Sequence, residues 1–264
     1  MHPKKDWKNF LNSFIILLFF FSFSEKVNAD FHLPLIKVPC GTTDCNLQYN
    51  MTNTHYKKAD NSNDLLIYLP GGRGTRNLGY SEIFPQTHLS SLRGKIDLVF
   101  LASPYPMPHP KSNAPLRKSK DHFARIKTVI DFYKKKTGKR IWLSGCSLGT
   151  NSVGHFLSNP EHHSLIHGAI FMCTNYNVVF RSKTIDMPIL LIHHNSDKCS
   201  SNPVSASIKL GKKIKKINKN DTTVIRISGG EASGDPCSAQ TSFHMFGSKA
   251  PEANDKILEY INSH

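Results

Sequence analysis

The chain has 264 residues, of which 39% are hydrophobic, and its 34 Lys and Arg residues outnumber 19 Asp and Glu residues, giving a formal net charge of +15. This apolar fraction is enough for a packed core and excludes an intrinsically disordered protein, while the length suits one α/β domain. The positive charge allows binding to polyanions but does not specify a fold.

Residues 1–29 have the pattern of a secretory signal peptide. Three lysines precede an apolar run over residues 14–23, and Val-Asn-Ala at residues 27–29 forms a small-residue cleavage site before Asp30. The run is shorter than the roughly 20 residues that a membrane-spanning helix needs, so cleavage is favoured over a membrane anchor. We expect an exported protein, periplasmic or extracellular, with no membrane span after cleavage.

Residues 30–63 are predicted to form a polar N-terminal segment of the mature protein. Export to an oxidising compartment would allow Cys40 and Cys45 to form a disulfide that closes a tight loop. Cys146 and Cys173, further along the chain, either pair with each other or are buried as free thiols.

From residue 64 onward, short apolar runs alternate with amphipathic stretches. Strands are expected at residues 33–38, 64–69, 96–102, 140–144, 169–173, 189–193 and 223–227. Helices are expected at residues 121–136, directly after residue 147, and near the C-terminus. This alternation is typical of a mostly parallel sheet with helices on both faces, so residues 64–264 are predicted to form one α/β domain with reactive loops at the carboxyl ends of its strands.

Two connecting segments bear on the openness of the predicted site. The prolines of residues 103–115 exclude both a helix and a central strand, so this stretch is predicted to be a loop beside the site. The connection between residues 173 and 188 has an ordinary length, without the insertion that a large cap domain would need. We therefore expect a site that is open to bulky substrates.

Residues 145–149 read Gly-Cys-Ser-Leu-Gly between an apolar strand and a helix. This layout is typical of a nucleophile elbow, in which a serine sits in a strained turn between two tiny residues. Ser147 is therefore the predicted nucleophile. The alternative is that Ser147 is an ordinary helix N-cap.

A serine nucleophile needs a histidine as base and a carboxylate to orient that histidine. Asp197 follows the strand at residues 189–193, whereas its rival Asp186 precedes that strand and would lie at the wrong end of the sheet. His244 lies in the loop between the last strand and the last helix. We predict a triad of Ser147, Asp197 and His244.

On these residues the chain resembles the α/β-hydrolase superfamily over residues 64–264. It is most similar to small secreted bacterial serine hydrolases of the esterase type, with an acid in a His-His-x-x-Asp-x-Cys loop and a histidine after Gly-Asp-Pro-Cys. Residues 193–199 and 234–237 match these two patterns. The resemblance implies a disulfide between Cys199 and Cys237 that joins the acid loop to the histidine loop.

The resemblance also implies an oxyanion hole made of two backbone N–H groups. One would come from Leu148, and the other from the Pro-Gly-Gly-Arg-Gly loop at residues 70–74, with Gly72 as first candidate and Arg73 as second. Many relatives begin this loop with His-Gly, where this chain has Pro70 followed by Gly71.

Two more histidines adjoin the acid. We interpret His193 as a strand-end side chain and His194 as a candidate pocket wall. Neighbouring strand residues point to opposite faces, which disfavours one metal ion bound by both. We expect no metal and no organic cofactor.

The sequence therefore predicts a secreted serine hydrolase, a carboxylesterase acting through an acyl-enzyme on a small-molecule or polymer-linked ester; amide or peptide hydrolysis uses the same groups. The alternative is a basic surface protein that holds polyanions with its Lys-rich stretch at residues 209–219. Isoleucines at near-helical spacing favour a solvated helix face there. The absence of interleaved aromatics argues against specific nucleic-acid binding.

Overall fold

The computed structural model describes residues 35–39, 51–72, 84–101 and 115–264. The predicted signal peptide, Arg73, the pair Cys40 and Cys45, and nearly all of the proline-rich segment lie outside these ranges. Those expectations stay predictions.

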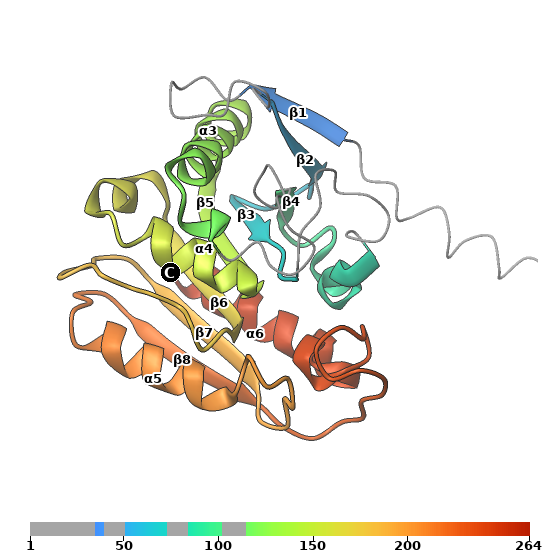
Figure 1. The fold of residues 1–264 in the computed structure, drawn as a ribbon. Helices are drawn as coiled ribbons and strands as arrows, with labels where there is room; N and C mark the ends of the chain where they lie inside the picture. Colours follow the sequence, from blue (N-terminus) through green and yellow to red (C-terminus); the bar gives the residue numbers. More distant parts are fainter. Residues whose placement is uncertain (1–34, 40–50, 73–83, 102–114) are drawn as a thin grey trace, which may run out of the picture. The chain divides into compact units, whose positions relative to one another are not determined.

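The described residues form an eight-stranded sheet in the order β1-β2-β4-β3-β5-β6-β7-β8 (Figure 1). The first two strands pair antiparallel, β2 pairs antiparallel with β4, and the other six run parallel to one another. The strands are β1 (Leu35–Pro39), β2 (Met51–Lys57), β3 (Asp64–Leu69), β4 (Asp97–Leu101), β5 (Arg140–Ser147), β6 (Gly168–Thr174), β7 (Ile189–His194) and β8 (Thr222–Ile227). The predicted mostly parallel sheet is confirmed.

The sheet begins before residue 64, where the domain was predicted to start. β2, which we did not predict, pairs with β4, and Tyr56 of β2 and Ala59 just after it are hydrogen-bonded to Asp97, the first residue of β4. Tyr56 Oη donates a hydrogen bond to Asp97 Oδ2 at 2.8 Å, and the Ala59 N–H donates to Asp97 Oδ1 at 2.8 Å. β2 has the polar sequence Met-Thr-Asn-Thr-His-Tyr-Lys, which has no strong apolar pattern, so the sequence alone does not reveal this strand.

Helices cover both faces of the sheet. On one face lie α3 (Lys120–Thr137), α4 (Leu148–Phe156) and α5 (Val204–Lys215), whose apolar residues share a core with alternate strand residues (Figure 1). On the other face, α6 (Ala250–Ser263) packs with the 3-10 helix η2 (Phe84–Leu92). The shorter 3-10 helices are η3 (Leu116–Lys118), η4 (Pro160–Leu165), η5 (Phe243–Met245) and η6 (Gly247–Lys249).

The central strands are apolar without alternation because both of their faces are covered. Every residue of β3, β4, β6 and β7 is buried. The helix predicted at residues 121–136 is α3. Its first turn is capped by Ser119, whose Oγ accepts from the His122 N–H, and it ends at Gly138 with φ 68°. The register of this parallel sheet brings the carboxyl ends of β5, β6, β7 and β8 to one edge.

The connection between β6 and β7 spans residues 175–188, all of which the structure describes, and it contains no helix. This confirms the expectation that no large cap domain is inserted there. Within the described ranges, no helix is long and apolar enough to cross a membrane.

Candidate active site

Ser147 stands at the junction of β5 and α4 in a conformation that L-residues rarely adopt. Its backbone has φ 54° and ψ −125°, and its hydroxyl makes no capping hydrogen bond to the helix. Such a conformation costs about 1–3 kcal/mol and persists where the surrounding structure enforces it. The N-cap alternative therefore does not hold, because the side chain caps nothing.

Three glycines allow this turn. A Cβ on Gly145 would lie 2.5 Å from the carbonyl carbon of Gly149, and a Cβ on Gly149 would overlap the Leu69 carbonyl oxygen. A Cβ on Gly71 would lie 2.7 Å from Ser147 Cβ. The two glycines of the motif thus let helix and strand approach each other. Gly71, which the sequence did not single out, lets the loop after β3 approach Ser147 closely.

The candidate acid and the candidate histidine lie within hydrogen-bonding distance of each other. Asp197 lies in the turn after β7 and His244 lies in η5, and His244 Nδ1 donates to Asp197 Oδ2 at 2.8 Å. Both side chains are almost completely buried. Asp186, the rival acid, is exposed and lies ahead of β7.

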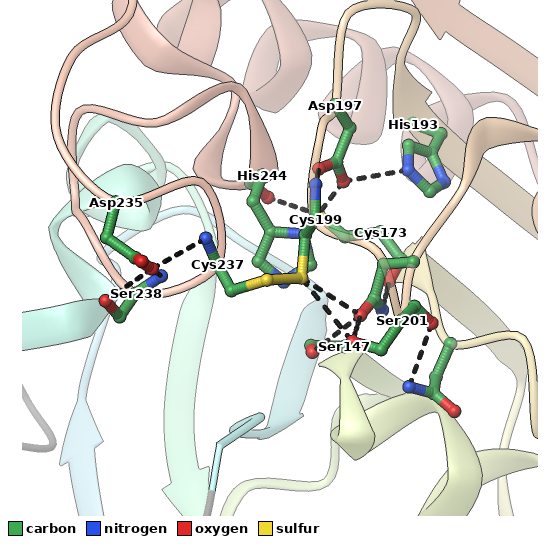
Figure 2. The surroundings of a disulfide bond; sticks show 12 residues. Ser147, Cys173, His193, Asp197, Cys199, Ser201, Asp235, Cys237, Ser238 and His244 are labelled. Atoms are coloured by element: carbon green, nitrogen blue, oxygen red, sulfur yellow. Dashed lines mark hydrogen bonds and ion pairs between the residues drawn. A yellow bond between two sulfur atoms is a disulfide. The ribbon is translucent and has the colours of Figure 1, made fainter.

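Asp197 receives two further hydrogen bonds. His193 Nε2 lies 3.0 Å from Oδ2, and the Cys199 N–H donates to Oδ1 at 2.8 Å. Figure 2 shows the carboxylate with His193 on one side and His244 on the other. Burial alone would raise the pKa of Asp197, but the hydrogen bonds from the two histidines and from Cys199 lower it to about 2. The carboxylate is therefore ionised at neutral pH.

The charge of Asp197 acts on His244. Burial alone would lower the pKa of His244, but the hydrogen bond to Asp197 and the nearby negative charge raise it. Because Nδ1 carries the proton that Asp197 accepts, neutral His244 has an unprotonated Nε2, which is the form a general base needs.

The hydroxyl of Ser147 is bonded to a residue that sequence reasoning missed. Ser147 Oγ donates to Asn202 Oδ1 at 3.4 Å, and Asn202 Nδ2 donates to the Cys173 carbonyl at 2.6 Å. Among the described contacts, none is a hydrogen bond between the side chains of Ser147 and His244. Asn202 lies in a Ser-Ser-Asn-Pro turn that reads as an ordinary loop, so nothing in the pattern marks it.

The disulfide implied by the resemblance is present. Cys199 of the acid turn is bonded to Cys237 of the loop that precedes His244, across a sequence separation of 38 residues (Figure 2). Cys146 and Cys173 are both free and buried, which decides between the two alternatives for this pair. Cys173 Sγ donates a hydrogen bond to the His244 carbonyl at 2.7 Å and so ties the histidine loop to β6.

The oxyanion candidates are placed in part. Leu148 is the first residue of α4, where backbone N–H groups have no partner within the helix. Gly72 has φ 70° and follows Gly71, which touches Ser147. The loop is held by Arg117, a fully buried side chain that we did not predict, whose Nη2 donates to the Pro70 carbonyl at 2.9 Å.

His194 is not a pocket wall. It is completely buried, its ring stacks on Phe243 with centroids 4.2 Å apart, and its Nε2 lies 3.0 Å from the Gly229 carbonyl. Its Nδ1 accepts from the Ser196 N–H. With one nitrogen donating and the other accepting, His194 is neutral and serves to brace the acid turn. The described residues contain no cluster of three potential metal ligands.

No family model matches the sequence, and no curated protein matches it. Solved structures do match, all at low identity. A lidless α/β serine hydrolase from Xanthomonas campestris has a TM-score of 0.59 at 12% identity, over 88% of this chain and 94% of that one. A hyperthermophilic esterase from Pyrobaculum calidifontis has a TM-score of 0.60 at 14% identity, over 88% of this chain and 85% of that one. A thermostable carboxylesterase from a metagenomic library has a TM-score of 0.58 at 15% identity, over 88% of each chain. The chain therefore has the α/β-hydrolase fold, as its resemblance implied.

Proposed function

We propose that the protein is a secreted serine hydrolase that cleaves carboxylic esters. The observation that carries the proposal is the arrangement at one edge of the sheet. Ser147 is held in a strained turn at the end of β5. The buried Asp197–His244 pair lies in neighbouring loops that the Cys199–Cys237 disulfide joins. The likeness to structures named as esterases supports the same reaction class.

In the proposed reaction, the Ser147 hydroxyl turns from Asn202 toward His244 and gives its proton to Nε2. The alkoxide attacks the ester carbonyl, and the tetrahedral intermediate collapses as His244 returns the proton to the leaving alcohol. Water, activated by the same nitrogen, then hydrolyses the acyl-enzyme. Asp197 stabilises the imidazolium that forms in each step.

The oxyanion is assigned to backbone N–H groups. Leu148 supplies one from the start of α4, where the helix dipole also favours negative charge. The loop of Gly71 and Gly72 supplies the other, with Arg73 as the second candidate. The contact of Gly71 with Ser147 supports this loop as the partner.

The substrate class follows from access to the site. The connection between β6 and β7, which the structure describes in full, holds no cap domain, and an open site of this kind suits small esters and esters attached to a polymer. Amide or peptide cleavage would use the same groups and is the competing reaction within this mechanism. Export is supported by the disulfide at the site, because such bonds persist in oxidising compartments.

A fluorophosphonate probe tests this proposal. The folded protein should be labelled, the Ser147→Ala variant should not, and the exposed Ser200→Ala variant should be labelled like the original. An unlabelled folded protein, or labelling that survives Ser147→Ala, would contradict the proposal. An unlabelled protein with salt-sensitive binding to polyanions would instead favour the basic-surface alternative.

The polyanion contact itself stays a prediction. α5 buries Leu210 and Ile214 and turns its lysines outward, as a solvated amphipathic helix does. One of those lysines, Lys213, donates to the Phe180 carbonyl at 2.7 Å and is thereby engaged within the protein.

A further inference from the structure

We propose that His193 is a positioning residue for the reaction: it fixes the carboxylate of Asp197 in the orientation that His244 requires. This inference rests on the proposed serine-hydrolase function. His193 was expected only as a strand-end side chain, and no role is assigned to it by the triad.

The contact between His193 and the acid is direct and dry. His193 Nε2 and Asp197 Oδ2 are 3.0 Å apart, and both side chains have no solvent exposure. The same oxygen accepts from His244 Nδ1 at 2.8 Å. An ionised carboxylate only accepts hydrogen bonds, so both imidazoles donate to it. The Cys199 N–H occupies Oδ1, and the carboxylate therefore cannot rotate without losing a charge-assisted bond.

His193 is itself held by two structural elements. Its Nδ1 is 2.8 Å from the Oγ of Ser207 in α5, and that hydroxyl is bonded at 2.7 Å to Thr174 Oγ1 at the end of β6. These side chains are all buried. An unbroken chain of hydrogen bonds thus runs from β6 through α5 and β7 to Asp197 and His244. It connects the loops that carry Asp197 and His244 to the sheet and to its covering helix.

The neighbouring histidine shows that this arrangement is not simply what burial demands. His194 is equally buried but satisfies its ring nitrogens with the backbone of Gly229 and Ser196. A core histidine with only a structural task could be satisfied in that way. His193 instead donates to the one carboxylate on which the base depends.

Two substitutions separate positioning from mere stability. The amide nitrogen of Gln can replace Nε2, so His193→Gln keeps a donor to Asp197. The shorter Asn places its amide near Nδ1, so His193→Asn keeps the contact with Ser207 and loses the one with Asp197. We expect fluorophosphonate labelling and ester turnover within about threefold of the original for Gln. For Asn we expect a loss of roughly ten- to a hundredfold in kcat with KM little changed, the magnitude of one lost charge-assisted bond.

The control is Ser207→Ala, which removes the hydrogen-bond partner of His193 Nδ1 and leaves the contact with Asp197. It should lower kcat less than His193→Asn does. Thermal melting of each variant is measured alongside. Equal losses in the Gln and Asn variants, or losses that follow the melting temperature, would overturn the inference.

A measurement on the unsubstituted protein keeps the inference testable even if a variant does not fold. Nitrogen-15 spectra of the histidines should show a protonated Nε2 on His193 and a protonated Nδ1 on His244. An unprotonated Nε2 on His193 would overturn the proposal. Failure of the proposed function and failure of this inference can be distinguished. An unlabelled unsubstituted protein refutes the serine-hydrolase proposal. A labelled protein whose His193 variants keep the original turnover refutes only the role of His193.

Discussion

Asp197 is the residue on which the rest of the site converges. Its two carboxylate oxygens accept from His193, His244 and the Cys199 backbone. Its pKa of about 2 lies below the ordinary value of about 3.9. The stability that these bonds contribute is therefore fully present above about pH 4 and is lost as the pH falls through about 2.

The raised pKa of His244 predicts the pH dependence of turnover. In the proposed reaction, turnover requires unprotonated Nε2, so kcat/KM should rise with pH, and its midpoint should lie above the ordinary histidine value of about 6.5. In Asp197→Asn the charge that raises the pKa is removed, and any residual activity should have a lower midpoint. A midpoint at or below about 6.5 in the unsubstituted protein would contradict the proposed role of His244.

Gly71 predicts a loss that comes from contact rather than from backbone conformation. An alanine there would place its Cβ 2.7 Å from Ser147 Cβ and 2.8 Å from the Cys146 carbonyl oxygen. We expect Gly71→Ala to lower the free energy of unfolding by about 1–3 kcal/mol and kcat by at least roughly tenfold. The matched control is Gly94→Ala, where φ is 74° but no atom lies within 4 Å of the new Cβ. That variant should lose a little stability in urea melts and no activity, and equal activity losses would refute the contact argument.

At the scale of elements, the site is a set of loops at the ends of parallel strands, and the disulfide joins two of them. Cys199 belongs to the acid turn after β7, and Cys237 belongs to the largely exposed loop between β8 and η5. The core beneath that loop is thin, since its residues from 228 to 238 are exposed. The covalent link therefore limits how far His244 can move from Asp197.

The double variant Cys199→Ser, Cys237→Ser tests this role of the disulfide. The parallel sheet does not depend on the link, so the far-ultraviolet circular dichroism should be unchanged at 25 °C, while kcat should fall by at least roughly tenfold. The variant is preferable to chemical reduction, because a reductant would also open the predicted Cys40–Cys45 bond. Unchanged turnover in the folded variant would count against the disulfide as a positioning device.

The sequence predicted those elements and residues whose physics is local. The Gly-x-Ser-x-Gly turn, the apolar strands and the helix ending at Gly138 depend on residues that are near one another in the sequence. They could therefore be predicted from it. Asn202, Ser207 and Arg117 could not be found in that way. Each acts through contacts 14 to 55 residues away along the chain, and each sits in a stretch of ordinary composition.

We expect the molecule as a whole to be an exported protein with the α/β-hydrolase fold. If the leader is cleaved after Ala29, protein recovered from the periplasm or the medium should begin at Asp30. Intact-mass measurement of the exported protein checks this, with the protein made without residues 1–29 as the mass standard. A protein with the full-length mass in the membrane fraction would instead favour the hypothesis that residues 1–29 act as a membrane anchor.

Peptide-level mass spectrometry after fluorophosphonate treatment tests the proposal that Ser147 is the nucleophile. We expect one phosphonyl adduct, carried by the peptide that contains Ser147. An adduct on any other residue, or a folded and unmodified protein, would contradict it.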